Sequence, residues 1–311
     1  MVRILCLNPV IDRMYYIDNF IPGRQYHGNI PEAYASGKGV NIMRIMRGFG
    51  LETVLYAFVG GANGKLVESE IERVGSRSVL FHHEGETRTT INIIDHSCRK
   101  ETEITEAGGK IDTQQQQEFL DCLSADCQRG DVIICSGLPA NGMSPDIYRK
   151  VSQIAEARDA YCVIDANRIY LKSSFPGKYL LAKPNKDELS RLFDNGALYT
   201  DDEALVAAKK LIGMGVENVL VSAGENGALF TNGSASYRVH VPNVEVISTI
   251  GSGDSTVSGF CYGHLKGCCL EECLSYAMAF GVVNAMHPEV GIVPPQEAEE
   301  MKSRITIERI S

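Results

Sequence analysis

The sequence predicts an α/β fold in which a mostly parallel sheet is covered by helices on both faces. Short apolar strands alternate with helices of about 10 to 15 residues along most of the chain, which is typical of parallel sheets. The alternation is interrupted at residues 12–35 and 87–106, where strands follow one another without a helix. No linker or repeat divides the chain, so we expect one domain over residues 1–311 with these two segments inserted.

The individual elements follow from the period of the apolar residues. Strands of the main sheet are predicted at residues 3–7, 53–59, 131–135, 161–165, 179–182, 218–222 and 227–231. Helices are predicted at residues 42–49, 63–74, 111–127, 145–158, 186–193, 202–214, 270–284 and 295–304. Short strands at 14–18, 28–35, 88–95 and 101–105 form the two insertions, which we expect to join into one small sheet.

Residues 244–265 combine strand, glycine-rich and helical patterns. Residues 244–250 are rich in β-branched side chains and predict a strand, and residues 255–265 have apolar positions at helical spacing. Between them, the run 251–254 (Gly-Ser-Gly-Asp) leaves backbone N–H groups unpaired where the helix dipole favours an anion. Asp254 in that place can take a proton from a hydroxyl that attacks a phosphate. The alternative for Asp254 is ordinary helix capping.

Composition excludes several classes of protein. The chain of 311 residues has a net charge of −9 and lacks the basic face of a nucleic-acid binder. No apolar run approaches the roughly 18 residues that a membrane span needs, and residues 1–9 do not form a signal peptide. The ten cysteines show no metal-binding spacing, so we expect reduced thiols and a cytoplasmic location.

Four further polar clusters follow predicted strands, at residues 8–12, 165–167, 183–188 and 222–227. Ligands bind at the carboxyl ends of strands in open α/β sheets, so these clusters are expected to share one site. Asn185 and Glu188 lie three residues apart at a helix start and offer the paired oxygens that Mg²⁺ accepts. Turn formation and helix capping are the alternative for each cluster.

Two common nucleotide motifs are excluded. The run 37–39 (Gly-Lys-Gly) lacks the spacing and the hydroxyl residue of a P-loop. The run 251–253 lacks the third glycine of a dinucleotide fingerprint and lies late in the chain.

Six motifs together resemble the ribokinase-like (PfkB) sugar kinase family, within it the branch of 1-phosphofructokinases and tagatose-6-phosphate kinases. The matching runs are 7–12, 36–41, 87–88, 102–104, 183–189 and 251–255, and the similarity covers nearly the whole length. The resemblance implies a ribokinase-like three-layer α/β/α sandwich with a small β-sheet lid. It also implies a homodimer through that lid and ATP-dependent phosphoryl transfer to a hydroxyl of a sugar or sugar phosphate.

The resemblance assigns roles to individual residues. Asp254 is implied as the general base, and the amides of residues 251–254 (Gly251, Ser252, Gly253) as the anion hole. Substrate binding is assigned to Asp12, Gly37, Lys38, Gly39, Asn41 and Arg88. Nucleotide binding is assigned to Lys183, Asn185, Ser222, Gly224, Gly227 and Asn284. Mg²⁺ is assigned to Asn185 and Glu188, and a monovalent cation such as K⁺ to the neighbourhood of Ser248, Ile250 and Gly291.

The departures from the branch pattern fall mostly on the sugar side. Ser36 stands where the branch has glycine, and Thr90 and Asn92 stand where it has asparagine and a basic residue. The runs 135–139 and 165–168 also differ. Fructose 1-phosphate or tagatose 6-phosphate is the expected type of acceptor. The alternatives are a kinase for an unphosphorylated sugar, polyol or nucleoside, and a non-catalytic sugar-phosphate sensor.

Overall fold

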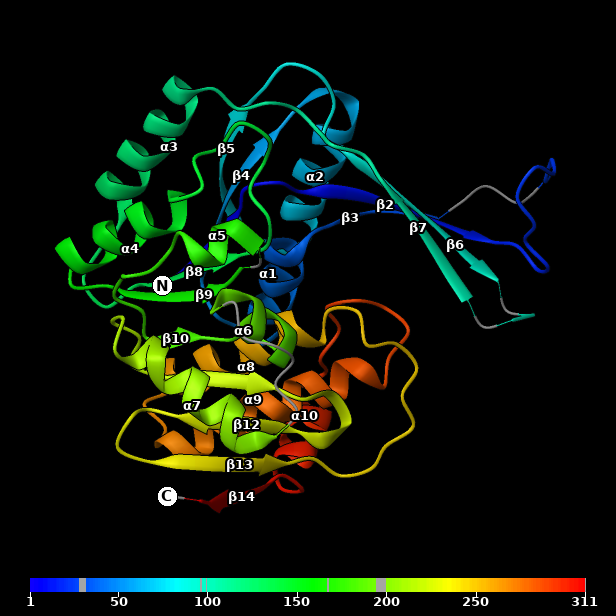
Figure 1. Cartoon of the computed structure of the whole chain (residues 1–311). Coiled ribbons are helices and arrows are strands. Elements are labelled where there is room, and N and C mark those ends of the chain that lie inside the picture. The colour runs from blue at the N-terminus through cyan, green and yellow to red at the C-terminus, as the bar shows by residue number, and fades with distance from the viewer. Residues whose placement is uncertain (28–31, 96, 99, 167, 194–199, 311) are drawn as a thin grey trace.

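The computed structural model describes residues 1–27, 32–95, 97–98, 100–166, 168–193 and 200–310 (Figure 1). The strands of its main sheet are β1 (Val2–Cys6), β4 (Thr53–Val59), β5 (Arg77–His82), β8 (Val132–Ser136), β9 (Tyr161–Asp165), β10 (Leu181–Ala182), β11 (Val219–Ser222), β12 (Ala228–Thr231), β13 (Ser236–His240) and β14 (Thr306–Arg309). Their order across the sheet is β14-β13-β12-β11-β10-β9-β8-β1-β4-β5. The strands from β11 to β5 in this order are parallel, and β12, β13 and β14 run antiparallel to their neighbours.

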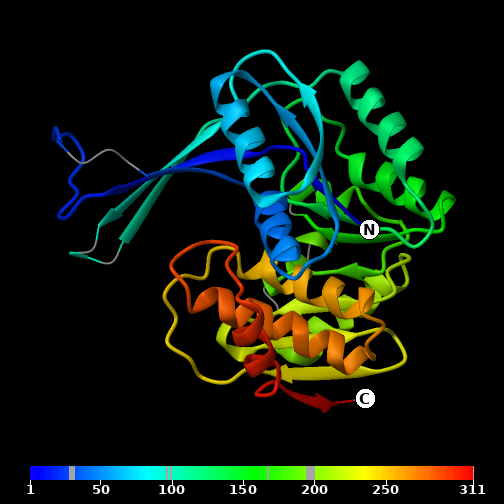
Figure 2. The ribbon, with the colours of Figure 1, turned by 180° about the vertical axis from the view of Figure 1, so that it is seen from behind.

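Helices cover both faces of the main sheet (Figures 1 and 2). One face packs against α3 (Thr113–Asp126), α4 (Ile147–Ala157), α6 (Lys186–Leu192) and α7 (Asp201–Ile212), beside the short α5 (Arg168–Lys172). The other packs against α1 (Lys38–Gly48), α2 (Gly61–Val74), α8 (Ser252–Leu265) and α9 (Leu270–Ala285), with α10 (Pro295–Lys302) against α9. Successive side chains of a strand point to opposite faces of the sheet and so contribute to the hydrophobic core on each side. Ile133, for example, faces the first helix layer and Ile134 faces the second.

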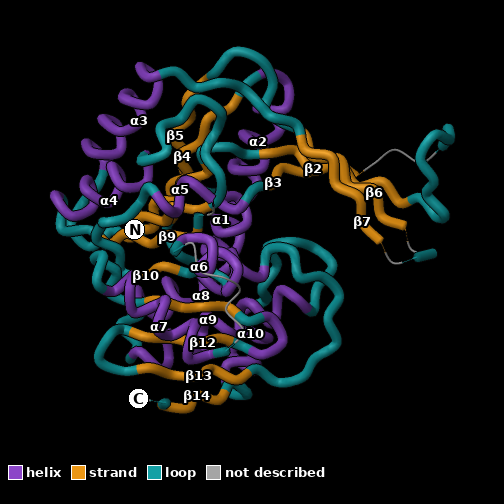
Figure 3. The backbone as a smooth tube through the Cα atoms, viewed as in Figure 1, coloured by secondary structure: helices purple, strands orange, loops and turns teal. Residues whose placement is uncertain are grey.

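A second, small sheet projects from the main body (Figures 1 and 3). It consists of β3 (Glu32–Ser36), β2 (Val10–Tyr16), β6 (Thr89–Asp95) and β7 (Lys100–Thr105), in the order β3-β2-β6-β7. β2 and β6 are parallel, whereas β2 with β3 and β6 with β7 are antiparallel. The two strand-only segments of the sequence therefore join into one sheet, as expected. The first part of the strand predicted at 28–35 lies outside the described residues.

The predicted fold class, a three-layer sandwich with a small additional sheet, is confirmed. The strand predicted at 244–250 is wrong, because β13 and β14 already occupy that edge of the sheet. This segment forms a loop whose Ile247 and Ser248 amides donate to the carbonyl of Ala285. Its β-branched side chains stay largely exposed, at 54% for Val246 and 57% for Ile247. Sequence reasoning also missed β5, β13, β14 and α5.

The helix that begins in the glycine-rich run, α8, packs closely against the next helix, α9. A side-chain carbon on Gly259 of α8 would collide with the Tyr276 carbonyl of α9, so only glycine fits there. This contact fixes the position of α8 relative to α9 and therefore fixes where the N-terminus of α8 lies. Among the described residues, no helix has the length and apolar content that crossing a bilayer requires.

Candidate active site

The polar clusters gather at one edge of the main sheet. β1, β8, β9, β10 and β11 are neighbours in the sheet and parallel, so their carboxyl ends meet on the same side. The bridge between Asn185 and Ser222 joins the ends of β10 and β11 directly. The expectation that the clusters share one edge is confirmed, except for Asn167, which lies outside the described residues.

The N-terminus of α8 faces this edge with free amides. Gly251 is the residue before the helix and has φ +78°, a left-handed conformation that favours glycine. The Ser252 amide donates to Thr249 O at 3.2 Å, but the amides of Gly253 and Asp254 have no acceptor within the described part of the chain. Two amides at the positive end of a helix can therefore receive an anion.

Asp254 is not a helix cap, so that alternative is wrong. It is the third residue of α8, and no side chain caps this helix. Its Oδ2 instead accepts a hydrogen bond from Asn41 Nδ2 of α1, at 2.9 Å. Asp254 is 3% exposed, and burial raises its pKa to about 6, although the charge of Lys38 opposes the rise. A carboxyl with this pKa can exchange a proton near neutral pH.

Three ionised side chains lie beside this turn. Asp165, at the end of β9, contacts Lys38 Nζ at 2.8 Å through Oδ2 and Lys183 Nζ at 3.2 Å through Oδ1. Lys183 Nζ lies 3.3 Å from where a Cβ on Gly253 would stand. Burial would raise the pKa of Asp165, but the charges of Lys183 and Lys38 hold it below its ordinary value. Sequence reasoning placed Asp165 in one of the polar clusters at the ligand edge but gave it no individual role.

The predicted sugar-binding residues come from three places: β2, the residue before β6, and the start of α1. Asp12 lies on β2, where burial raises its pKa and the nearby Arg88 charge partly offsets the rise. Arg88 precedes β6, and its Nε is buried without a hydrogen-bond partner. Gly37 has φ +110° before α1, and a Cβ on Gly39 would stand 2.5 Å from Cys6 Cβ, so Gly39 allows α1 to lie against β1. Their contacts with a sugar stay predictions.

Asn185 and Glu188 cap α6 reciprocally. Glu188 N donates to Asn185 Oδ1 at 2.7 Å, and Asn185 N donates to Glu188 Oε2 at 2.9 Å. The capping alternative is therefore realised for this pair. It uses one carboxylate oxygen, and within the described part of the chain Glu188 Oε1 makes no hydrogen bond. No cluster of three His, Cys, Asp or Glu suited to a metal occurs among the described residues, so a Mg²⁺ site here stays a prediction.

The predicted nucleotide residues frame the other side of the edge. The Ser222 amide donates to Pro184 O, Gly224 is exposed, and Gly227 is buried where a Cβ would collide with the Val239 carbonyl. Asn284 is buried and ties two loops together: its Nδ2 donates to Ile250 O at 2.8 Å, and its Oδ1 accepts from Gly291 N at 3.0 Å. Asn284 thus shapes the loops, and its contact with a nucleotide stays a prediction.

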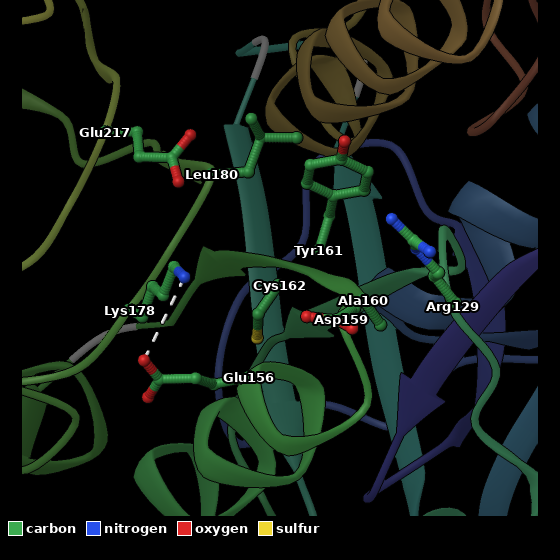
Figure 4. A pocket seen from close by; sticks show the side chains of 9 residues that line it. All are labelled: Arg129, Glu156, Asp159, Ala160, Tyr161, Cys162, Lys178, Leu180 and Glu217. Carbon is green, nitrogen blue, oxygen red and sulfur yellow. Dashed lines mark ion pairs between the residues drawn. The ribbon is translucent and has the colours of Figure 1, made fainter.

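A separate cavity opens at the opposite edge of the sheet (Figure 4). It has a volume of about 270 Å³ and is lined by residues next to the amino ends of β9 and β10, including Tyr161 and Leu180. The salt bridge between Lys178 and Glu156, at 3.9 Å, lies across it. None of the predicted site residues lines this cavity, and Asp165 is at the other end of β9. The candidate active site is therefore the carboxyl edge.

Comparison with known proteins shows the family of the chain. Residues 5–297 match the sequence pattern of the family described as "pfkB family carbohydrate kinase". The chain belongs to the pfkB family of carbohydrate kinases. It is 31% identical to tagatose-6-phosphate kinase of Staphylococcus epidermidis, over 99% of both chains. It is 28% identical to 1-phosphofructokinase of Bacillus subtilis, over 94% of both chains.

Solved structures show the same fold. Phosphofructokinase-2 of Escherichia coli in complex with potassium has a TM-score of 0.90 at 20% identity, covering 97% of this chain and 98% of that one. A tetrameric inhibited form of the same enzyme has a TM-score of 0.88. The pfkB membership identifies the protein as a carbohydrate kinase, which transfers a phosphoryl group to an alcohol.

Burial of Asp254 predicts a stability effect. Its pKa is about 6 in the folded protein against 3.8 ordinarily, so the ionised form destabilises the fold above pH 6. Asp254→Asn should therefore raise the free energy of unfolding by on the order of 2–3 kcal/mol at pH 8, because about two pKa units are removed. The gain should shrink as the pH falls from 6 towards 3.8, because the unfolded carboxyl then becomes protonated as well and the two states differ less.

Urea unfolding of both proteins between pH 4 and 8 measures this effect. Asp131→Asn is the control of opposite sign, because Gln128 N–H and Arg3 outweigh burial and hold the pKa of Asp131 below its ordinary value. A less stable Asp254→Asn at pH 8 would contradict the prediction.

Proposed function

We propose that the protein transfers the γ-phosphoryl group of ATP to a hydroxyl of a sugar phosphate of the fructose 1-phosphate or tagatose 6-phosphate type. The observation that carries this proposal is the juxtaposition of Asp254 with unpaired amides and two lysines at one helix N-terminus. The two named relatives, a tagatose-6-phosphate kinase and a 1-phosphofructokinase, support the class of acceptor.

Asp254 is the general base of the proposed reaction. It accepts the proton of the acceptor hydroxyl while the oxygen bonds to the γ-phosphorus and the bond from phosphorus to the ADP oxygen breaks. Negative charge on the phosphoryl oxygens is stabilised by the amides of Gly251, Gly253 and Asp254 and by nearby Lys38. Ser252 contributes less through its amide, because that amide already donates to Thr249.

Mg²⁺ fits next to Asn185 and Glu188. The helix cap holds the Glu188 carboxylate in place and leaves its second oxygen for a metal ion. Mg²⁺ typically binds through one or two carboxylates and keeps several of its waters. When bound, the ion neutralises charge on the ATP phosphates. We place the nucleotide along Lys183, Ser222 and Gly224, and a K⁺ ion near Ser248, Ile250 and Gly291, where the loops are joined by Asn284. The potassium complex of the Escherichia coli enzyme supports a cation in this fold.

Arg88 is the residue that we assign to the substrate's own phosphate. Its side chain is half-buried at the base of the small sheet, with one long hydrogen bond, from Nη2 to Asn8 O at 3.3 Å, and a buried Nε that has no partner within the described residues. A phosphate would pair with the Nε and Nη2 fork. Asn92 adds no charge for a phosphate, and its Nδ2 donates to Met14 Sδ at 3.4 Å.

Loss of the general base should remove turnover. Asp254→Asn should lower kcat by about 10²- to 10⁴-fold while Mg·ADP still binds, because proton transfer is lost and the fold is kept. In the wild type, kcat/KM should fall below pH 6 as Asp254 becomes protonated, since its pKa is about 6. Coupled ADP-release assays and calorimetry measure these quantities. Near-normal turnover of the variant would rule out Asp254 as the base.

A panel of sugars with Mg·ATP tests the acceptor. We expect turnover with a phosphorylated ketohexose, and Arg88→Ala should raise its KM by about 100-fold, because a charged hydrogen-bond pair is lost. Arg13→Ala is a matched control, since residue 13 lies on the opposite face of β2 from Asp12. Equal KM changes for free and phosphorylated sugars would remove Arg88 from the phosphate site, and preferred turnover of free sugars would favour the alternative kinase. Sugar-phosphate binding without ADP release would favour a sensor.

We also propose that the protein is a homodimer joined through the small sheet. The sheet projects from the body and carries exposed apolar side chains on both faces, with Tyr16 53% and Ile104 56% exposed. Sedimentation equilibrium should give the mass of a dimer. Tyr16→Glu should weaken the dimer if the face that carries Tyr16 is covered, and Ile104→Glu should weaken it if the opposite face is covered. Ile169→Glu on α5 is the control, because Ile169 is also 56% exposed. A monomeric wild type would refute this proposal.

A further inference from the structure

Asp165 is the carboxylate that holds both lysines of the site. It is 2% exposed, and each of its oxygens contacts a different ammonium group: Oδ2 contacts Lys38 at 2.8 Å and Oδ1 contacts Lys183 at 3.2 Å. The three residues come from the end of β9, the first residue of α1 and the residue after β10. One side chain therefore sets the separation of two cations that belong to different elements.

The two lysines need such a partner. Lysine has a flexible four-carbon stem, so its ammonium group is placed only when something fixes it. The Lys183 side chain is 6% exposed, and its Nζ lies next to Gly253, whose amide is free in the described structure. Both lysines also interact electrostatically with Asp254. Asp254 is the other buried carboxylate whose charge acts on both ammonium groups.

We propose that Asp165 is a positioning residue for phosphoryl transfer: it holds the Lys38 and Lys183 ammonium groups beside the Gly251–Asp254 turn and keeps them from pairing with Asp254. Each ammonium group has three N–H donors and uses one on Asp165, so the others remain for phosphoryl oxygens. Asp254 meanwhile stays free to accept the proton of the acceptor hydroxyl. The inference rests on the proposed function and adds a residue to it.

The competing explanation is that Asp165 only neutralises buried charge. The chain contains a matched control for this, because Asp131 also bridges two cations. Its Oδ2 contacts Arg3 Nε at 2.7 Å and its Oδ1 contacts the Met1 ammonium at 3.3 Å. Asp131 precedes β8 and is therefore at the opposite edge of the same sheet, away from the site. Asp131→Asn removes a comparable buried charge without touching the proposed machinery.

The experiment compares Asp165→Asn with Asp131→Asn in the full-length protein. Asp165→Asn should lower kcat by about 100-fold while the KM of the sugar changes by less than about threefold, because the ammonium groups are displaced while Asp12, Asn41 and Arg88 stay in place for the sugar. Asp131→Asn should lose thermal stability and keep its kcat. A kcat of Asp165→Asn equal to that of Asp131→Asn overturns the proposal.

A second readout does not depend on turnover. Calorimetric titration with Mg·ADP and with Mg·AMP-PNP, a non-hydrolysable ATP analogue, separates contacts to the γ-phosphate from contacts to the rest. Asp165→Asn should weaken Mg·AMP-PNP by about tenfold and leave Mg·ADP unchanged, because the lysines act on the terminal phosphate. Equal weakening of both nucleotides, or of neither, overturns the proposal.

Asp165→Glu covers the case in which Asp165→Asn does not fold. It keeps the charge but moves the carboxylate by one methylene, so the protein should remain folded with kcat about tenfold lower. Wild-type kcat in Asp165→Glu counts against positioning. If the wild type phosphorylates no sugar of the panel, the proposed function fails, while the two nucleotide titrations still decide the role of Asp165.

Discussion

The contact between α1 and β1 is the constraint on which the site depends. Gly39 lies against Cys6 so closely that any side chain would collide, and the backbone of the first turn of α1 therefore rests on the end of β1. This close approach brings Lys38 within reach of Asp165, and it brings Asn41 within 2.9 Å of Asp254. A larger residue at position 39 would move the whole first turn outward. The packing of α1 against β1 alone therefore requires glycine at position 39, whether or not this residue also contacts the substrate.

Much of the fold could be predicted from the sequence because buried parallel strands are continuous apolar runs. The strands that were missed are different in kind. β13 mixes serine, tyrosine, arginine, valine and histidine, and β14 is mostly exposed. β14 is the edge strand and β13 lies next to it, and strands in this position depend on pairing with a neighbour more than on their own composition. The wrong strand at 244–250 is the converse case: its β-branched residues fit a sheet, but β13 and β14 already occupy that edge.

The sequence predicted that the candidate site lies at one edge of the main sheet, but it did not predict the ion pairs of Asp165 with the two lysines. The rule that ligands bind at carboxyl strand ends selects residues near Asp165 and Lys183, but it does not say which face their side chains take. The alternation of side chains along the strands predicts this face. Val163 and Leu181 face the layer of α1 and α8, and Asp165 and Lys183, two positions further along, therefore face the same layer. The lysine pairs span 127 and 18 positions in the sequence, so no local pattern reveals them.

Capping and ligand binding are compatible in this site, and Glu188 shows why. A carboxylate has two oxygens, and the reciprocal cap uses Oε2 on the Asn185 amide while Oε1 remains. The cap fixes the side chain at the helix start, which lowers the entropy that a metal or its waters would otherwise have to overcome. Asp254 shows the opposite solution. It lies in the first turn of α8, yet it leaves the helix amides free and takes its hydrogen bond from Asn41. The amides at the helix end thus remain for an arriving anion, because the acid of the first turn does not bond to them.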